Sequence, residues 1–307
     1  ADHIYKMDVM QMVTAHIQSG AECTVSAMPV PIEEASQYGI MAVDDSGRIV
    51  EFQEKPERPA PMPGDASRAL ASMGNYVFTR AALVRAVTED ARSRTSSNDL
   101  GKNIVPMFVK AGAARAYSFA DNRILGADPT AMPYWRDVGT LDSYYEACTD
   151  LVSVSPKFDL YNPLWPIMSH YEPAGPAKFV FADRKRDRIG MATDSMVCEG
   201  CIISGGQVDH SVLGPRVRIN SFAEVESSIL FEGVNVGRRA RIRNAIVDKD
   251  VDIPPDTIIG FDAEADRERF AMTESGIVII PKSAKLARRV RSVEPSLRAD
   301  PLAPRLG

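Results

Sequence analysis

Val217-Arg218-Ile219, Val234-Asn235-Val236 and Val251-Asp252-Ile253 repeat one apolar-polar-apolar triplet at successive steps of 17 residues. Further apolar residues keep the same interval: Val208, Val225, Ile242 and Ile259, and also Val212, Ile229 and Ile246. Alternation within each triplet has the period of a strand. A repeat of about 17 residues is typical of the hexapeptide-type parallel β-helix, whose coils must stack to bury their inward faces. A β-meander that keeps this interval is the alternative, and the coincidence of the registers argues against it.

The composition excludes several classes of protein. The chain has 307 residues, 45% of them hydrophobic and 25% charged, which is enough for two globular domains. A net charge of -5 gives no electrostatic footprint for nucleic acid, and no apolar run is long enough to predict a membrane span. The chain has only four cysteines, and no secretory leader precedes them, so we expect reduced thiols and a cytoplasmic protein. They are Cys23, Cys148, Cys198 and Cys201. Cys198 and Cys201 form an isolated CxxC, which we expect to pack inside the first coil.

The first half of the chain alternates predicted helices and strands, which indicates an α/β layer. We expect helices over residues 7–19, 80–90 and 99–111, strands over 23–28 and 73–78, and a hairpin whose arms are 39–43 and 48–52. Prolines accumulate between residues 153 and 178, as in a linker. The repeats then occupy about 180–260, and 277–280 has the composition of a strand. The expected domains are therefore 1–152, a linker 153–180, a β-helix 181–290 and a tail 291–307.

Two polar clusters could carry chemistry. Glu54-Lys55-Pro56 follows directly after a strand, and such a pair suits a sugar phosphate, because the carboxylate accepts from hydroxyls and the ammonium group meets the phosphate. Tyr134 to Thr140 combines an aromatic pair with Asp137 and a glycine turn. Asp2 is a third carboxylate, and two carboxylates that also share substrate phosphates are a usual Mg²⁺ arrangement. A solvated turn and a structural loop are the alternatives for the two clusters.

Several runs together resemble bacterial ADP-glucose pyrophosphorylase, also called glucose-1-phosphate adenylyltransferase. They are Asp2-His3-Ile4-Tyr5-Lys6-Met7-Asp8, Met28 to Ala35, Phe52-Gln53-Glu54-Lys55-Pro56, Leu70 to Gly74 and Tyr134 to Thr140. The resemblance continues through Pro176-Ala177-Lys178-Phe179 and the repeats to Val278. It implies an α/β fold with a partial Rossmann-like nucleotidyltransferase domain, followed by a left-handed parallel β-helix. It also implies an enzyme of glycogen biosynthesis that joins ATP and glucose 1-phosphate into ADP-glucose and pyrophosphate.

The resemblance assigns roles to individual residues. It implies that Gly39, Glu54, Lys55 and Ser72 bind glucose 1-phosphate and that Trp135 shapes the pocket. Asp2 and Asp137 would hold the catalytic Mg²⁺. It further implies a homotetramer that anionic effectors regulate, with Lys249 and Lys282 at positions where the family holds effector phosphates. Lys285, Arg288 and Arg289 lie near these positions.

The chain departs from the family in one respect. A glycine-rich loop that holds the ATP phosphates is expected before Asp2, and no such run occurs in the sequence. Ser204-Gly205-Gly206 lies inside the repeats and is no substitute, because a phosphate cradle needs a loop of free backbone N–H groups. We therefore expect this polypeptide to lack a proper ATP site and to be inactive alone.

Three alternatives remain open at this stage. The first is a non-catalytic β-helix module that assembles subunits or binds effector anions. The second is a hexapeptide acyltransferase, in which His210 would be the catalytic base; we expect His210 at a surface corner instead, and both polar clusters would be idle in such an enzyme. The third is a different sugar nucleotidyltransferase, against which the Met28 to Ala35 and Trp135 to Thr140 runs argue.

Overall fold

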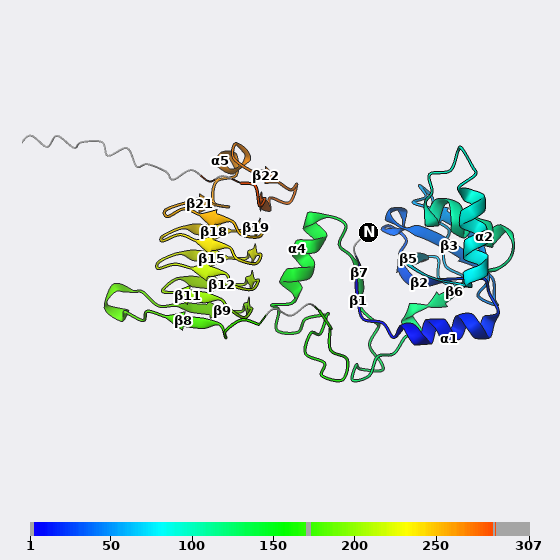
Figure 1. Ribbon diagram of the computed structural model, residues 1–307, viewed down its shortest axis with the longest axis horizontal. Coiled ribbons are helices and arrows are strands. Elements are labelled where there is room, and N and C mark those ends of the chain that lie inside the picture. Colours follow the sequence, from blue (N-terminus) through cyan, green and yellow to red (C-terminus); the bar gives the residue numbers. More distant parts are fainter. Residues whose placement is uncertain (1–2, 170–172, 285, 287–307) are drawn as a thin grey trace, which may run out of the picture. The chain divides into compact units, whose positions relative to one another are not determined.

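The structure, a computed structural model, describes residues 3–169, 173–284 and 286. The chain divides into two compact units, residues 1–147 with 156–170 (unit 1) and residues 148–155 with 171–307 (unit 2). Unit 1 is an α/β layer and unit 2 is a parallel β-helix (Figure 1). The predicted fold class, an α/β nucleotidyltransferase-type domain followed by a left-handed β-helix, is confirmed.

The sheet of unit 1 is mixed and has the strand order β4-β3-β5-β2-β6. Its strands are β2 (Cys23–Pro31), β3 (Gly39–Val43), β4 (Ile49–Glu54), β5 (Arg68–Phe78) and β6 (Ala114–Ser118). The predicted hairpin is confirmed, since β3 and β4 pair antiparallel with Gly39 opposite Glu54. The first five residues of β2, Cys23 to Ala27, are all buried, because the strand lies in the interior of the sheet between β5 and β6.

Helices cover this sheet, and one of them differs from its prediction. They are α1 (Val9–Ser19), α2 (Arg80–Asp90) and α3 (Val105–Lys110), with single turns η1 (Ala35–Gln37), η2 (Leu100–Ile104) and η3 (Phe119–Asp121). Helix α4 (Leu141–Asp150) follows later in the chain. Helix α1 begins where the Asp8 side chain accepts from the Met10 N–H and ends at Gly20, which has φ 64°. The expected helix over 99–111 is instead the π-helical turn η2 followed by α3. Pro106 lies in the first turn of α3. Because it has no backbone N–H, it cannot donate the hydrogen bond that would continue the preceding helical turn.

A short ribbon joins two distant parts of unit 1. Strand β1 (His3–Tyr5) pairs antiparallel with β7 (Trp135–Asp137), so that His3 lies opposite Asp137. The side chains of Tyr5 and Trp135 pack on a small core around Met12 and Phe119. The ribbon therefore brings the first residues described to the second polar cluster of the sequence.

Unit 2 has three strand faces, which are parallel ladders apart from one antiparallel pair at the end of the third face. One holds β8 (Lys178–Val180), β11 (Ile202–Ser204), β14 (Arg218–Ile219), β17 (Asn235–Val236) and β20 (Asp252–Ile253). Another holds β9 (Met191–Thr193), β12 (Gln207–Asp209), β15 (Glu224–Glu226), β18 (Arg241–Arg243) and β21 (Ile258–Ile259). The third holds β10 (Met196–Val197), β13 (Val212–Leu213), β16 (Ile229–Leu230), β19 (Ala245–Val247), β23 (Val278–Ile280) and β22 (Ala271–Met272). The turn η4 (Arg184–Arg186) and helix α5 (Ala263–Arg267) complete the unit.

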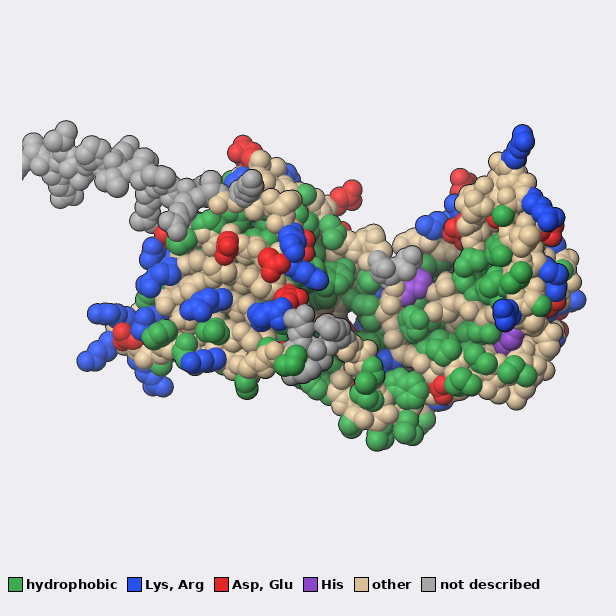
Figure 2. Space-filling model, in the orientation of Figure 1, with side chains coloured by type: hydrophobic (Ala, Val, Ile, Leu, Met, Phe, Trp, Pro, Cys, Tyr) green, Lys and Arg blue, Asp and Glu red, His purple; other side chains and the backbone are tan. Residues whose placement is uncertain are grey.

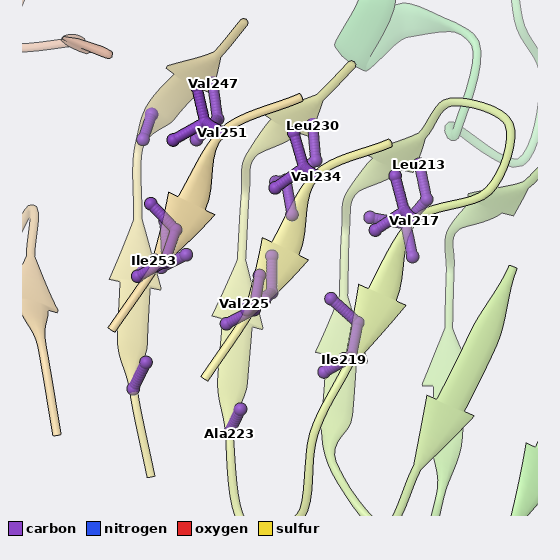
Figure 3. Close-up of a cluster of buried hydrophobic side chains, with 14 of the residues drawn as sticks. Leu213, Val217, Ile219, Ala223, Val225, Leu230, Val234, Val247, Val251 and Ile253 are labelled. Atoms are coloured by element: carbon purple, nitrogen blue, oxygen red, sulfur yellow. The ribbon is translucent and has the colours of Figure 1, made fainter. Parts of the chain in front are cut away.

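The 17-residue interval of the sequence is the coil of this β-helix. Val208 pairs with Val225, and Val225 pairs with Ile242, across neighbouring strands of one face. The repeated apolar residues point inward and stack, as Figure 3 shows for Val217, Ile219 and Val234. These side chains are fully buried. The stacking explains why one coil needs its neighbours, since each covers the apolar edge of the next.

The cysteines and the charged loops occupy ordinary structural places. Cys201 is buried in the core of unit 2, its thiol contacts the Gly214 carbonyl at 3.1 Å, and the four cysteines form no disulfide with one another. In the described chain, the helices are too short or too polar to cross a membrane. Lys and Arg side chains gather on the loop that follows β8 (Figure 2), where Arg184, Lys185 and Arg186 form η4. The Arg188 guanidinium stacks 4.9 Å from the centre of the Phe181 ring.

Candidate functional site

A cavity of about 680 Å³ in unit 1 collects residues from several distant segments. It opens where β3 begins and β4 ends, beside β5 and the β1–β7 ribbon. Five predicted site residues line it: Gly39, Glu54, Lys55, Ser72 and Asp137. The two polar clusters of the sequence, about 80 residues apart in the chain, therefore face one space.

Glycines leave room for the Glu54 carboxylate. A Cβ at Gly39 would lie 3.0 Å from Glu54 Oε2 and 2.8 Å from the Phe52 ring, and a Cβ at Gly101 would lie 3.3 Å from the same oxygen. All three distances are shorter than ordinary van der Waals contact. A side chain at either glycine would therefore press on the carboxylate and force it to shift.

Lys55 has an uncommon backbone conformation at the rim of the cavity. Its φ is 49°, in the left-handed region that non-glycine residues rarely adopt. The Lys55 N–H donates to the Tyr38 carbonyl at 3.0 Å, which fixes the turn after β4. Pro56 follows and restricts the chain further.

Polar groups of β5 form the floor of the cavity. The Ser72 hydroxyl accepts from the Gly74 N–H at 3.2 Å, and Gly74 has φ 72°. Burial raises the pKa of the Tyr76 phenol; a hydrogen bond with Ser72 opposes this, and the nearby Glu54 and Asp99 carboxylates add to it. Tyr76 therefore stays a neutral hydrogen-bonding group at physiological pH.

Asp137 and its neighbours form the opposite wall. The Asp137 Oδ1 accepts from the Gly139 N–H at 3.0 Å and lies 3.8 Å from His3 Nε2. The Trp135 ring contacts the rings of His3 and Tyr38 edge-on, each at a centroid distance of 5.3 Å. Among the described residues the buried Trp135 Nε1 has no hydrogen-bond partner. Burial, with a contribution from the Asp137 carboxylate, raises the pKa of Tyr38.

A second cavity, of about 850 Å³, adjoins the first. Gln37, Tyr38 and Asp137 line both, and Trp135 lines only the second. The second cavity is also bordered by Met28 to Pro31, the end of β2. Unit 1 therefore offers two adjoining spaces, and Asp137 belongs to the wall of each.

The remaining predicted residues lie elsewhere. Asp2 and Lys285, Arg288 and Arg289 fall outside the described residues. Lys249 and Lys282 belong to unit 2, where both backbone N–H groups donate to the Asp248 carboxylate, at 2.7 and 3.2 Å. The Lys282 ammonium pairs with Asp250 at 2.9 Å, and both side chains are more than 60% exposed.

Several lining residues had not been singled out from the sequence: His3, Tyr38, Tyr76, Asn98, Asp99 and Gly101. His3 belongs to the run Asp2 to Asp8 that carries the family resemblance, but the sequence assigned it no role in binding or catalysis. Asp99 caps the turn η2 by accepting from the Lys102 N–H at 2.8 Å, and its only sequence signal was an acid before a predicted helix. The others had no signal in composition or spacing.

Comparison with known proteins identifies the class and then the family. Residues 1–153 match the nucleotidyl transferase family, and residues 175–280 match the family described as GlmU-like, C-terminal hexapeptide. The chain is thus a nucleotidyltransferase-type α/β domain joined to a hexapeptide β-helix.

A relative places it more narrowly. The chain is 53% identical over 287 residues to the glucose-1-phosphate adenylyltransferase of Anaeromyxobacter sp. (strain Fw109-5). The aligned region covers 93% of this chain and 70% of that enzyme. The chain belongs to the glucose-1-phosphate adenylyltransferase family, as the resemblance implied.

Proposed function

We propose that the cavity of unit 1 binds glucose 1-phosphate for transfer of an adenylyl group from ATP, with ADP-glucose and pyrophosphate as products. The observation that carries the proposal is the convergence of Gly39, Glu54, Lys55, Ser72 and Asp137 on one cavity. The name of the Anaeromyxobacter relative supports the same substrates. Glycogen biosynthesis in the cytoplasm is the corresponding role, and four cysteines that form no disulfide with one another are compatible with a reducing compartment.

The sugar half of the substrate matches the polar groups on the cavity wall. The Lys55 ammonium provides a point charge for the phosphate, and the Glu54 carboxylate accepts hydrogen bonds from sugar hydroxyls. The Ser72 hydroxyl can donate to the ligand while it accepts from Gly74. Trp135, which lines the adjoining cavity, would shape the pocket.

The adenylyl transfer itself needs positioning more than proton transfer. The attacking group is a phosphate oxygen that is already anionic; it forms a bond to the α-phosphorus of ATP while the bond to pyrophosphate breaks. Residues that align the two phosphates and neutralise their charge supply the catalysis. The site for the ATP phosphates is not identified within the described residues, so the proposal for unit 1 centres on the sugar phosphate.

Mg²⁺ is the metal that we propose for this site, with Asp137 and Asp2 as its protein ligands. Asp137 fits this role, because its contacts to Gly139 and His3 both use Oδ1 and leave Oδ2 for a cation. Mg²⁺ prefers carboxylate oxygens and substrate phosphates, and when bound it would neutralise phosphate charge. His3 lies opposite Asp137 in the β1–β7 ribbon and restricts where that carboxylate can turn.

Lys249 and Lys282 are the residues that we propose for an anionic effector, in a family-type homotetramer. Their backbones share the Asp248 carboxylate, so the two side chains leave unit 2 from neighbouring points. An effector phosphate would have to compete with Asp250 for the Lys282 ammonium. Asp250→Asn should therefore tighten binding of a sugar bisphosphate to the chain, whereas Lys282→Gln should weaken it.

The reaction is tested by pyrophosphate release from ATP, glucose 1-phosphate and Mg²⁺. It is measured for the 307-residue chain and for the same chain joined to the part of the Anaeromyxobacter enzyme outside the alignment. Release by the joined protein that is lost in its Lys55→Gln form supports the proposal. A joined protein that is folded and still inactive with effector supplied would show that the substrates are assigned wrongly.

A further inference from the structure

We propose that Asp194, Asp209 and His210, on a corner of the β-helix in unit 2, bind a divalent transition-metal ion such as Zn²⁺. One ligand atom from each residue lies within 4.8 Å of those of the other two. Ligands about 2.1 Å from a zinc ion lie about 3.4 Å apart in a tetrahedral site, so small side-chain rotations suffice to close around the ion. The site is in unit 2, whereas the proposed catalytic residues belong to unit 1.

The stacking of coils creates this cluster. Asp209 pairs with Thr193 in the ladder of β12 and β9. Asp194 and His210 are the next residues of the two strands, and both have left-handed conformations, with φ 42° and 44°. Because neighbouring strands lie about 4.8 Å apart, equivalent side chains leave the corner side by side. Asp194 comes from one coil and Asp209 and His210 from the next.

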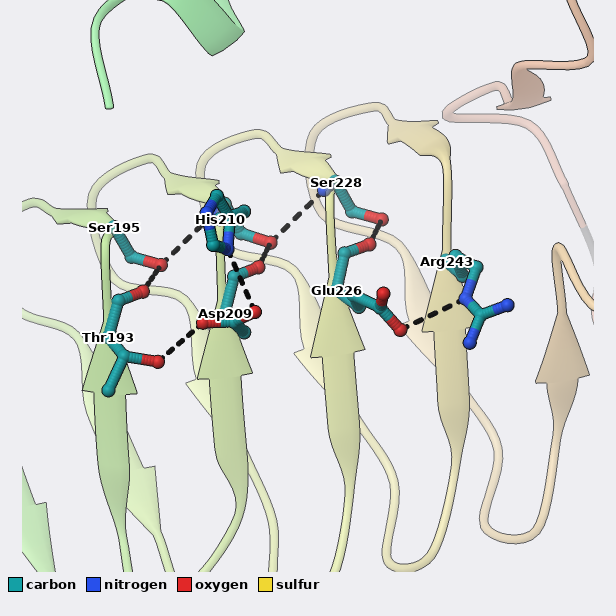
Figure 4. Close-up of polar contacts among 8 residues, drawn as sticks. Thr193, Ser195, Asp209, His210, Glu226, Ser228 and Arg243 are labelled. Atoms are coloured by element: carbon teal, nitrogen blue, oxygen red, sulfur yellow. Dashed lines mark hydrogen bonds and ion pairs between the residues drawn. The ribbon is translucent and has the colours of Figure 1, made fainter. Parts of the chain in front are cut away.

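Hydroxyl groups hold the backbone of the corner in place (Figure 4). The Ser195 hydroxyl donates to the Thr193 carbonyl and accepts from the Ser211 N–H at 3.0 Å. The Ser211 hydroxyl repeats this pattern with the Asp209 carbonyl and the Ser228 N–H. The ligand-bearing turns are therefore fixed by bonds that do not use the ligand atoms, which lowers the entropy cost of forming a metal site.

The donor set suits a borderline metal ion. An imidazole nitrogen and two carboxylates are ligands for zinc, and solvent can supply the remaining position because the His210 side chain is 58% exposed. The Thr193 hydroxyl donates to Asp209 Oδ1, which orients that carboxylate as an outer-shell partner does in known sites. His210 Nδ1 lies 2.8 Å from Asp209 Oδ2, so these two ligands already face one another.

The charge at the corner favours a cation. Asp194, Asp209 and Glu226 are the carboxylates that face the His210 ring. The charge of Glu226 is balanced by Arg243, whose guanidinium lies 2.9 Å away. Among the described residues, His210 is the only basic side chain that pairs with Asp194 or Asp209. An ion bound here would link two successive coils near the beginning of the β-helix.

The experiment titrates the EDTA-stripped, dialysed 307-residue chain with Zn²⁺ by calorimetry and follows the His210 ring nitrogens by NMR. We expect one-site binding that shifts the His210 signals and leaves those of the buried His16 unchanged. His210→Gln and Asp194→Asn should each weaken this binding roughly tenfold or more. Glu224→Gln, a carboxylate on the same face that pairs with Arg241 at 2.7 Å, is the matched control and should bind as the unmodified chain does.

The same experiment separates this site from that of Mg²⁺. Asp137→Asn should leave the His210 shifts and the affinity unchanged. Folding of each variant is checked by its thermal transition, and bound Zn²⁺ should raise the melting temperature of the unmodified chain but not that of His210→Gln. No His210 shift at millimolar Zn²⁺, or equal affinity in His210→Gln, would overturn the proposal.

Discussion

Gly39 and Glu54 face each other across the β3–β4 hairpin, and a Cβ at Gly39 would lie 3.0 Å from the Glu54 Oε2. The first residue of one strand therefore determines where the carboxylate at the end of the next can lie. Gly39 has an ordinary backbone conformation, so space and not φ explains the glycine.

Gly39→Ala should displace the Glu54 carboxylate and the Phe52 ring, because its Cβ would lie within 3.0 Å of both. We expect a loss of roughly tenfold in affinity for glucose 1-phosphate, about 1.4 kcal/mol, measured by calorimetry on the 307-residue chain. Gly175→Ala is the control, because a Cβ there meets no atom within 4 Å. Equal affinity in the two variants would show that the position of the Glu54 carboxylate has no part in binding.

Ser211→Ala should destabilise the β-helix. The Ser211 hydroxyl accepts from the N–H of Ser228, a residue that is fully buried, and the variant would leave that donor unpaired. The expected cost is about 1–3 kcal/mol in the free energy of unfolding, measured with urea. Ser195→Ala removes the equivalent bond in a more exposed coil and should cost less. A larger loss in Ser195→Ala would contradict the burial argument.

Asp44 should make stability depend on pH below 4. The hydrogen bond from the Ser46 hydroxyl, at 2.7 Å, is the main cause that lowers the pKa of Asp44 to about 2, and Arg48 adds to it. The folded chain therefore binds this proton less readily than the unfolded chain, so the stabilisation is present above pH 4 and is lost as the pH falls towards 2. The stability difference between the unmodified chain and Asp44→Asn should narrow over that range. A constant difference would contradict the assignment.

Cys23 and Cys201 should resist alkylation while the chain is folded. Burial raises the pKa of the Cys23 thiol to about 12 and that of Cys201 to about 11, and the thiolate is the reactive form. With iodoacetamide at pH 8, mass spectrometry should find Cys148 and Cys198 modified before the two buried thiols, because both are partly exposed. All four should react in urea. Early modification of Cys23 in the folded chain would refute its burial.

The β-helix was predictable because its signal is periodic. Coil stacking forces inward residues such as Val217, Val234 and Val251 to recur at one interval, and the ladders repeat that interval. Helix α1 and the β3–β4 hairpin were predictable for a local reason: each has its own boundary signals, Gly20 for the helix and the turn after Val43 for the hairpin.

The cavity was predictable only in part. Glu54 and Lys55 form a visible pair, and the resemblance drew attention to Asp137. His3, Tyr38 and Asp99 come to the cavity through contacts that no local pattern encodes, such as the β1–β7 ribbon between strands about 130 residues apart. The π-helical turn before Pro106 was missed because the apolar spacing there also fits an ordinary helix.

The central claim is that the cavity of unit 1 binds a sugar phosphate through Lys55. The most direct test is calorimetric titration of the 307-residue chain with glucose 1-phosphate, compared with Lys55→Gln and with the exposed Lys110→Gln as control. Loss of a charged hydrogen bond, worth about 1.5–3 kcal/mol, predicts affinity roughly ten- to a hundredfold weaker in Lys55→Gln alone. Equal affinity in all three proteins, or no binding by the unmodified chain, would contradict the account.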